Sequence, residues 1–360
     1  MTYSLTIKSV SARPAMVPLS RPITTAKIVI DKAPLVLIDV YAQEGVTGRS
    51  YIFGYTPLSL RPLTAMVENI ADTLIGKTID PVTRFAEMEA MFRLLGRQGV
   101  VGMAMAGLDV AFWDARAKAQ DMSVAAVLGA EERPIKCYDS HGFFDPKRDE
   151  KDLELSLSQG FDALKFKLGA ETVDDDLARL RAAKDIVGSD KALMLDYNQA
   201  FSSAEAIRRM RRIEEEFDLD WIEEPVLAED YAGHRAVRAA LRTPVQTGEN
   251  WWLPDDAARA VQAEICDHAM LDLIKIGGVT GWMRAAAIAQ GASLPVSSHL
   301  FPEASAHVLA ATPNCHLLEW MDVTGAIAVE PYEIENGHLA PKGPGFGLEW
   351  DEKALAKYLL

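Results

Sequence analysis

From residue 134 onward the sequence repeats one pattern eight times, a short strand-like run separated from the next by a helical segment. The runs are IKCYDS, ALKFKLG, ALMLDYN, DWIEEP, PVQTGEN, HAMLDLI, PVSSHL and CHLLEW. Eight β units with seven helices between them, over about 185 residues, predict an α/β fold of the (β/α)7β type, a modified TIM barrel. A doubly wound open sheet is the competing architecture, but it usually begins with a Gly-rich first turn, which this sequence lacks.

The chain before the barrel reads as a smaller unit of strands followed by helices. The runs LTIKSVSARPAMVPL and APLVLIDVYAQEGVTGRSYIFG come first, the second folding about QEG, and helical patterns follow at about 57–76, 81–95 and 102–119. This order predicts an N-terminal α+β capping domain over residues 1–130 and a barrel domain over residues 131–325. Residues 326–360, which include the Gly/Pro-rich NGHLAPKGPGFGLEW, are expected to pack back on the first domain.

Charge and composition exclude several classes of partner. The net charge of −15, with no dense basic stretch except the helix face RRMRRIEEE, argues against nucleic acid. No window approaches 18 uninterrupted apolar residues and the N-terminus has no signal-peptide pattern, so we expect neither a membrane span nor export. Cys137, Cys266 and Cys315 sit in or beside apolar runs without metal-type spacing. They are expected to be buried thiols of a cytoplasmic protein.

Polar side chains lie at the C-terminal ends of all eight predicted strands, where barrels of this kind carry their functional groups. They are Ser140, Lys165, Lys167, Asp196, Asn198, Glu223, Glu249, Asp272, His299 and Glu319. Any one of them could simply begin a solvated loop. Burying the whole ring without compensation would be costly, so a cation is expected within it.

Three of these carboxylates predict a metal site. Asp196, Glu223 and Glu249 come from consecutive strands, so their side chains can converge on one point. An all-oxygen set of ligands is what Mg²⁺ prefers. Glu224 follows Glu223, but the period of two sends its side chain to the opposite face, where a salt bridge is expected.

The remaining ring members suggest proton transfer. Lys165 and Lys167 point to the same face of one strand, and their mutual repulsion together with a nearby metal ion should lower their pKa toward that of a general base. His299 stands across the ring, with Asp272 placed to set its tautomer. Such a set suits removal of a proton α to a carboxylate from one face and its return from the other. Glu319, if protonated, could donate a hydrogen bond to the developing charge.

Motifs along nearly the whole chain resemble the enolase superfamily and, within it, the mandelate racemase subgroup. They include APLVLIDV, GLDVAFWDA, LDYNQ, WIEEP, PVQTGENW, KIGGVTGW, SSHLF and SAHVLAATP, in the same order. The resemblance implies Mg²⁺ at the three carboxylates, with Lys167 and the His299–Asp272 pair as the two acid/base catalysts and Glu319 as the electrophilic acid. It also implies that Lys165, Ser140 and Asn198 lie near the bound substrate, and that the first domain carries the loops that decide specificity.

The sequence departs from this subgroup where specificity is decided. The stretch RPITTAKIVIDKAP carries Lys27 where the family loop is aliphatic, and Phe166 replaces a small polar residue between the two lysines. Trp320 and Met321 follow Glu319 where the family differs. Lys27 and Tyr55 are therefore candidate substrate-binding residues. The alternatives are that Lys27 is an exposed loop lysine without a role and that Tyr55 is an ordinary core aromatic.

The leading hypothesis is an Mg²⁺-dependent racemase or epimerase of a 2-hydroxy acid, and the alternative is an acid-sugar dehydratase that uses the same metal, Lys167 and His299. The dehydratases of this group more often resemble K-x-R than K-x-K, which favours the racemase. Lys275 corresponds to a base of the muconate-lactonising branch, but the presence of His299 with Asp272 makes a structural role more consistent. A small-molecule carboxylate is the expected partner, and a homo-oligomer such as an octamer is expected by resemblance.

Overall fold

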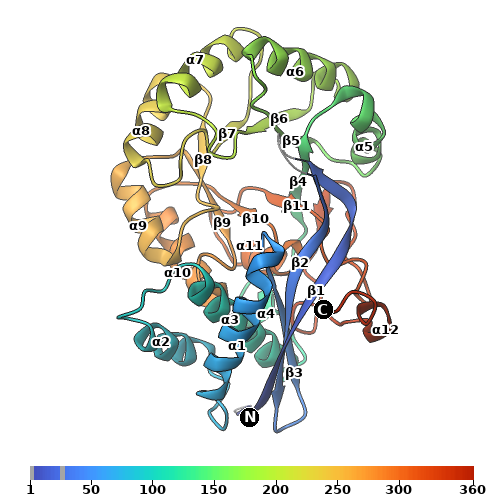
Figure 1. Cartoon of the computed structure of the whole chain (residues 1–360), viewed down its shortest axis with the longest axis vertical. Helices are drawn as coiled ribbons and strands as arrows, with labels where there is room; N and C mark the ends of the chain where they lie inside the picture. Colours follow the sequence, from blue (N-terminus) through green and yellow to red (C-terminus); the bar gives the residue numbers. More distant parts are fainter. Residues whose placement is uncertain (1–3, 25–28) are drawn as a thin grey trace.

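The structure is a computed structural model that describes residues 4–24 and 29–360. It consists of a barrel lobe and a smaller capping lobe, with the long strands of the capping lobe reaching up to the barrel (Figure 1). Lys27, a predicted substrate-binding residue, lies outside the described residues. No helix among the described residues is long and apolar enough to cross a membrane.

The capping lobe is a three-stranded antiparallel sheet covered by helices. Its strands pair in the order β1 (Ile7–Thr24), β2 (Val29–Ala42) and β3 (Thr47–Phe53), with β2 and β3 joined as the predicted hairpin. The helical elements are η1 (Pro57–Ser59), α1 (Leu60–Asp72), α2 (Pro81–Met91), α3 (Val100–Lys118) and α4 (Val124–Val127). Residues 33–40 of the central strand β2 are all buried, because neighbouring elements cover both faces of the sheet. The helices α1 and α3 supply one of these covers.

The barrel has eight parallel strands, one from each predicted run. They are β4 (Ile135–Phe143), β5 (Ala163–Lys167), β6 (Ala192–Asp196), β7 (Trp221–Glu223), β8 (Val245–Thr247), β9 (His268–Asp272), β10 (Val296–His299) and β11 (Leu318–Trp320). Strand pairing runs from β10 through β9 to β4 and then to β11. Backbone hydrogen bonds from Ser298 N to Leu317 O (3.1 Å) and from His316 N to Val296 O (2.7 Å) close the ring. The barrel prediction is therefore confirmed, and the open doubly wound sheet was the wrong alternative.

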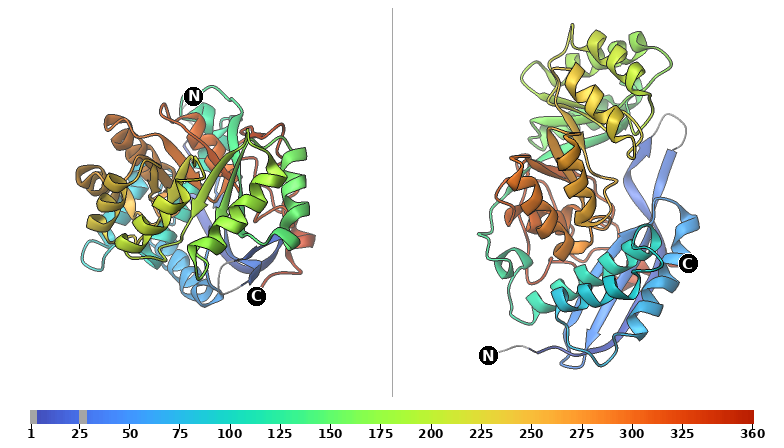
Figure 2. Two further views of the ribbon diagram at one scale, coloured as in Figure 1. Left: turned by 90° about the horizontal axis from the view of Figure 1, so that it is seen from above. Right: turned by 90° about the vertical axis from the view of Figure 1, so that its left-hand side faces the viewer.

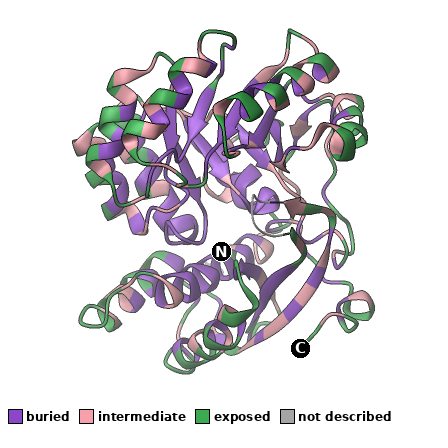
Figure 3. Cartoon of the chain, turned by 45° about the horizontal axis from the view of Figure 1, so that its top comes forward, coloured by how far each residue is buried: buried purple, intermediate pink, exposed green. Residues whose placement is uncertain are grey.

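Seven helices surround the barrel and bury its outer face (Figure 2). They are α5 (Pro146–Ser158), α6 (Val173–Val187), α7 (Ser203–Ile213), α8 (Tyr231–Ala240), α9 (Leu253–Ala263), α10 (Gly278–Gly291) and α11 (Pro302–Ala310). Figure 3 shows that the barrel strands are buried while the outer faces of the helices are exposed. Side chains alternate along each strand. Leu164 and Phe166 pack outward under the helices, whereas Tyr138, Met194 and Trp221 fill the interior.

The C-terminal segment contacts both lobes. The strand β12 (His338–Leu339) pairs with β4, and α12 (Glu352–Leu355) precedes a backbone bridge between Leu359 and Ala15 of β1.

An ion pair at 2.5 Å joins Arg21 of β1 to Asp139 of β4, which holds the end of β1 against the barrel. The exact boundaries of the domains, near residues 130 and 325, stay a prediction.

Candidate active site

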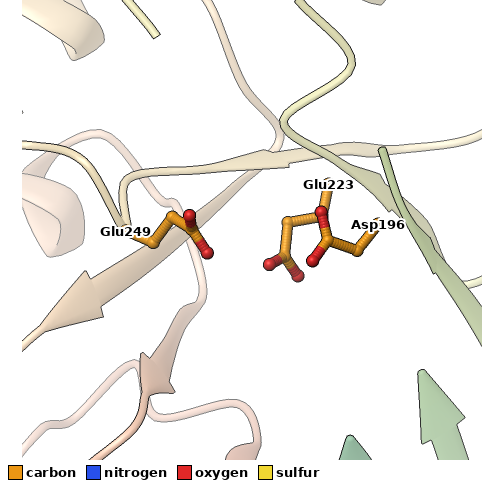
Figure 4. A group of neighbouring side chains, drawn as sticks. All are labelled: Asp196, Glu223 and Glu249. Carbon is orange, nitrogen blue, oxygen red and sulfur yellow. The ribbon is translucent and has the colours of Figure 1, made fainter. Parts of the chain in front are cut away.

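Three carboxylates gather at the C-terminal rim of the barrel (Figure 4). Asp196 ends β6, Glu223 ends β7 and Glu249 follows β8, and one oxygen from each lies within 4.8 Å of the others. All three residues are buried. The chain reaches Glu249 through Gly248, which has a φ of +133° and whose missing Cβ would lie 2.6 Å from the carbonyl oxygen of Met270. Only glycine fits this turn, and the turn brings the Glu249 side chain to the rim.

Each of these carboxylates is paired with a different cationic side chain. Lys165 Nζ lies 2.8 and 2.9 Å from the two oxygens of Glu223. Lys167 Nζ lies 2.7 Å from Asp196 Oδ2, and His299 Nε2 lies 3.3 Å from Glu249 Oε2. The residues predicted as metal ligands and those predicted as acid/base groups therefore form one cluster. The donor set, three buried carboxylates in reach of one point, fits Mg²⁺.

The burial of so many acidic groups shifts their titration. Burial raises the pKa of Glu223 well above its ordinary value, and the charges of Asp196 and Glu249 add to this effect against the opposing charge of Lys165. Burial also acts to raise the pKa of Glu249, but the positive charges of His299 and Lys275 outweigh it and lower the pKa to about 2. A divalent cation at the centre of the cluster would offset the repulsion among the three carboxylates.

The protein groups taken alone raise the pKa of both lysines, so the lowering expected from the sequence would depend on the metal ion. Burial, together with the charge of Lys165, acts to lower the pKa of Lys167, but the charges of Asp196 and Glu249 and the hydrogen bond to Asp196 act in the opposite direction, and the pKa is raised. Burial likewise opposes charge on Lys165, yet Glu223 and Glu319 raise its pKa well above the ordinary value. The sequence shows that the two lysines are neighbours on one face, but not how closely the carboxylates of other strands approach them.

The protein groups around Glu319 favour its ionised form, whereas donation of a hydrogen bond requires the protonated form. Burial acts to raise its pKa, but the charge of Lys165, whose Nζ lies 2.9 Å from Glu319 Oε1, and that of His299 lower the pKa to about 2. The backbone N–H of Leu300 also donates to Glu319 Oε2 at 2.8 Å. Both contacts favour the charged carboxylate.

His299 is oriented by Asp272 as the sequence predicts. Its Nδ1 lies 2.8 Å from Asp272 Oδ2, and because a carboxylate can only accept, Nδ1 carries the proton and Nε2 faces Glu249 and the centre of the site. The N–H groups of Ile274 and Lys275 each donate to Asp272 Oδ1 at 2.8 Å, which fixes the carboxylate. Burial acts to lower the pKa of His299, but the charge of Glu249 and the bond to Asp272 raise it.

The predicted substrate-binding residues have varied surroundings. The Ser140 hydroxyl is buried, and no described residue is within hydrogen-bonding reach of it. Asn198 accepts a hydrogen bond from Lys167 Nζ at 2.6 Å and donates to Asp196 Oδ2 at 3.0 Å, so it holds this ion pair. Tyr55 donates to Asp272 Oδ2 at 2.7 Å.

Two neighbours of the cluster differ from expectation or were not anticipated. Glu224 makes no salt bridge within the described parts of the chain; it accepts hydrogen bonds from Asn250 Nδ2 (2.8 Å) and Thr247 Oγ1 (3.2 Å). Burial and the charge of Glu249 raise its pKa to about 8. Asn250, which sequence reasoning missed, also donates to Glu249 Oε1 at 3.1 Å and accepts from Lys275 Nζ at 2.7 Å. Its position directly after Glu249 was the only signal that could have revealed it.

Comparison with known families covers nearly the whole chain. Residues 7–129 match the family described as the mandelate racemase / muconate lactonizing enzyme N-terminal domain, and residues 150–354 match the one described as enolase C-terminal domain-like. A crystal structure of an enolase from Bradyrhizobium complexed with magnesium and mandelic acid is 48% identical, with a TM-score of 0.98 and full coverage of both chains.

More distant relatives catalyse different reactions. The L-talarate/galactarate dehydratase of Salmonella typhimurium is 27% identical over 335 residues, which span 90% of this chain and 84% of the relative. The L-Ala-D/L-Glu epimerase of Bacillus subtilis is 26% identical over 314 residues, 83% of each. The family matches confirm the resemblance inferred from the sequence motifs. The chain belongs to the enolase superfamily, in its mandelate racemase / muconate lactonizing enzyme family.

Proposed function

We propose that this protein is an Mg²⁺-dependent racemase or epimerase of a 2-hydroxy acid that moves the α-proton between two bases. The observation that carries the proposal is the arrangement of Lys167 and His299. They approach the carboxylate cluster from different strands, β5 and β10, and bind different members of it, Asp196 and Glu249. A substrate held between them presents its α-carbon to an amine on one side and to an imidazole on the other.

The metal ligands, the two bases and the substrate-binding residues have separate roles in the proposed reaction. Asp196, Glu223 and Glu249 would hold Mg²⁺, which would supply positive charge next to the substrate carboxylate. Lys167 Nζ takes the α-proton from one enantiomer while His299 Nε2 delivers a proton to the opposite face, and the two groups exchange these roles for the other enantiomer. Lys165 and Glu319, paired at 2.9 Å, lie beside the substrate carboxylate. The Ser140 hydroxyl, which has no partner among the described residues, is proposed to hydrogen-bond the substrate.

The relatives support this function and one alternative. The Bradyrhizobium enolase binds magnesium and mandelic acid, a 2-hydroxy acid, and shares 48% of its sequence with this chain. The Salmonella relative is an acid-sugar dehydratase. In that reaction Lys167 would take the α-proton, and His299 would protonate the β-hydroxyl as it leaves as water. The resulting enol would become a 2-keto-3-deoxy acid.

Proton NMR in D₂O with Mg²⁺ tests the proposal on (R)- and (S)-mandelate and on galactarate and gluconate. We expect α-deuteration of a 2-hydroxy acid by the wild-type protein, abolished by EDTA. Lys167→Ala should slow α-proton exchange of one enantiomer by about 10²–10⁴-fold. His299→Asn should slow exchange of the other enantiomer by a similar factor. Lys191→Ala, which removes a surface lysine paired with Asp162, is the matched control and should exchange both normally.

Two outcomes decide between the readings. A 2-keto-3-deoxy product from a sugar acid would assign the protein to the dehydratases. If Lys167→Ala and His299→Asn, each folded by circular dichroism, exchange both enantiomers at the wild-type rate, the two-base mechanism is wrong. Assembly as a homo-oligomer such as an octamer and a cytoplasmic location remain predictions from the sequence.

A further inference from the structure

Tyr55 of the capping lobe is held in an unusual backbone conformation at the edge of the active site. Its φ is +58°, in the left-handed region that is unfavourable for a residue with a Cβ. Short hydrogen bonds lock the turn around it: Gly54 N donates to Pro34 O (2.7 Å), and both Thr56 N and Ser59 Oγ donate to Gly54 O (2.6 Å each). Strain that is fixed in this way is typical of residues that must point in one direction for function.

The turn aims the Tyr55 hydroxyl at the carboxylate that orients the predicted base. Tyr55 Oη donates to Asp272 Oδ2 at 2.7 Å, and the same oxygen accepts from His299 Nδ1 at 2.8 Å. Two backbone N–H groups of the loop after β9 occupy the other oxygen of Asp272. Among the described residues, four donors therefore surround the carboxylate, and Tyr55 is the one that comes from the capping lobe.

The ring of Tyr55 is fixed as firmly as its hydroxyl. Lys275 Nζ lies 4.4 Å from the ring centroid, a cation–π geometry, while the same amine donates to Asn250 Oδ1 at 2.7 Å. Phe53 packs edge-on against the ring at 5.1 Å between centroids. Although 37% of the residue is exposed, its hydroxyl end is held between the two lobes.

We propose that Tyr55 is a positioning residue for the His299–Asp272 pair, through which the capping lobe controls proton transfer on the histidine side of the site. The proposal rests on the two-base function above. The single hydroxyl proton of Tyr55 is given to Asp272, so this role is additional to the substrate-binding role expected from the sequence, which stays a prediction. A capping lobe that is not seated would leave Asp272 with one donor fewer and the imidazole less firmly oriented.

The chain offers a matched control for this role. Tyr51, also on the capping lobe, donates to a buried barrel carboxylate, Glu303 Oε2, at the same distance of 2.7 Å. Glu303 also accepts a hydrogen bond from Thr324, and within the described residues its side chain makes no hydrogen bond or ion pair with a predicted catalytic group. Tyr55→Phe and Tyr51→Phe thus each remove one hydroxyl between the lobes and keep the ring. Only the first should affect His299.

NMR of the Mg²⁺-loaded full chain with ¹⁵N-labelled histidine tests the contact without any substrate. The chain has seven histidines, and the Nδ1–H signal of His299 is identified by its loss in His299→Asn. In Tyr55→Phe this signal should move downfield, because His299 no longer shares Asp272 Oδ2 with a second donor. It should stay in place in Tyr51→Phe. An unmoved signal in Tyr55→Phe, or an equal movement in both variants, overturns the proposal.

Exchange kinetics test the consequence for catalysis. Racemisation rates cannot separate the two bases, because the equilibrium constant between the enantiomers is 1 and kcat/KM is therefore the same in both directions. The α-proton exchange of each mandelate enantiomer in D₂O is measured separately instead. Tyr55→Phe should slow exchange of the enantiomer that faces His299 by about 10- to 100-fold, with the other changed by less than about 2-fold and little change in KM. Equal loss for both enantiomers would show a merely structural role. If the wild-type protein exchanges neither enantiomer, the racemase function fails for mandelate, while the histidine signal still decides the role of Tyr55.

Discussion

Replacing Lys165 by methionine would test whether the buried cations hold the site together. The amine is 1% exposed and lies 2.8–2.9 Å from both oxygens of Glu223 and from one oxygen of Glu319. Methionine has a similar length and fills the same space without charge. The substitution therefore leaves two buried carboxylates without the cation they share.

The expected loss follows from this geometry. Removing one partner of a buried ion pair costs about 3–5 kcal/mol, because the remaining charge is neither solvated nor neutralised. Here one of the carboxyls can instead take up a proton, and Glu223 is the candidate, since burial and the charges of Asp196 and Glu249 already raise its pKa. A carboxyl whose pKa is raised on folding stabilises the fold most at low pH, and this contribution is lost as the pH rises through the raised pKa. The deficit of the variant should be larger at pH 8 than at pH 5.

Urea unfolding in EDTA, followed by far-UV circular dichroism and by tryptophan fluorescence, measures the free energy of unfolding when the two transitions coincide. The surface pair Lys191–Asp162 provides the control, and Lys191→Met should cost less than about 1 kcal/mol. Mg²⁺ at a hundred times its Kd should raise the free energy of unfolding of the wild-type protein by about 2.7 kcal/mol. Saturating Mg²⁺ should raise the free energy of unfolding of Lys165→Met by at least the same amount. A loss in Lys165→Met no greater than in Lys191→Met, at both pH values, would refute this account of the cluster.

Two further predictions concern the fold around the site. Burial lowers the pKa of His307 to about 3, and its Nδ1 accepts a hydrogen bond from Ala125 N at 3.2 Å, so the unfolded chain binds a proton there that the folded chain does not. Stability is therefore lost as the pH falls below about 6.5. Replacing this histidine in His307→Gln should reduce the slope of the unfolding free energy against pH by about 1.4 kcal/mol per pH unit between pH 4 and 6. An unchanged slope would contradict this explanation. A Cβ on Gly48 would lie 2.1 Å from the carbonyl oxygen of Ala111, where β3 crosses α3, so Gly48→Ala should cost about 1–3 kcal/mol or more in urea unfolding. Gly291→Ala, with nothing within 4 Å of the new Cβ, should be neutral or stabilising, and equal losses in the two variants would count against the steric explanation.

The barrel and the metal cluster could be predicted from the sequence because both depend on chain topology. Parallel strands of a barrel end at one rim, and the period of two fixes which residues of each strand face inward. Asp196 and Glu223 are the last residues of β6 and β7 and pair with each other in register. Their convergence therefore requires no knowledge of loops or of side-chain rotamers. The same reasoning correctly placed His299 next to Asp272, which are paired in register on β10 and β9.

The contacts that cross from one lobe to the other could not be predicted in this way. Tyr55 reaches Asp272, 217 positions away in the sequence, only because a strained turn of the capping lobe is seated against the barrel. The hydrogen-bond partners of Glu224 were not predicted either, because Asn250, which also donates to Glu249, reaches Glu224 from a loop whose path depends on Gly248. Loop paths and the docking of lobes depend on packing across the whole molecule, which periodicity does not encode.

The ionisation of the site depends on contacts that the sequence does not show. A sequence shows that two lysines are neighbours, which by itself lowers the pKa of each, but a pKa depends on every charge nearby. At this rim the lysines lie among the carboxylates of several strands. Asp196 faces Lys167, and Glu223 and Glu319 face Lys165, so the pKa of both lysines is raised. A divalent ion would offset the charge of these carboxylates, so the same carboxylates that would bind the ion also govern how readily Lys167 gives up its proton. Metal binding and base strength are for this reason properties of one cluster and cannot be assigned to separate residues.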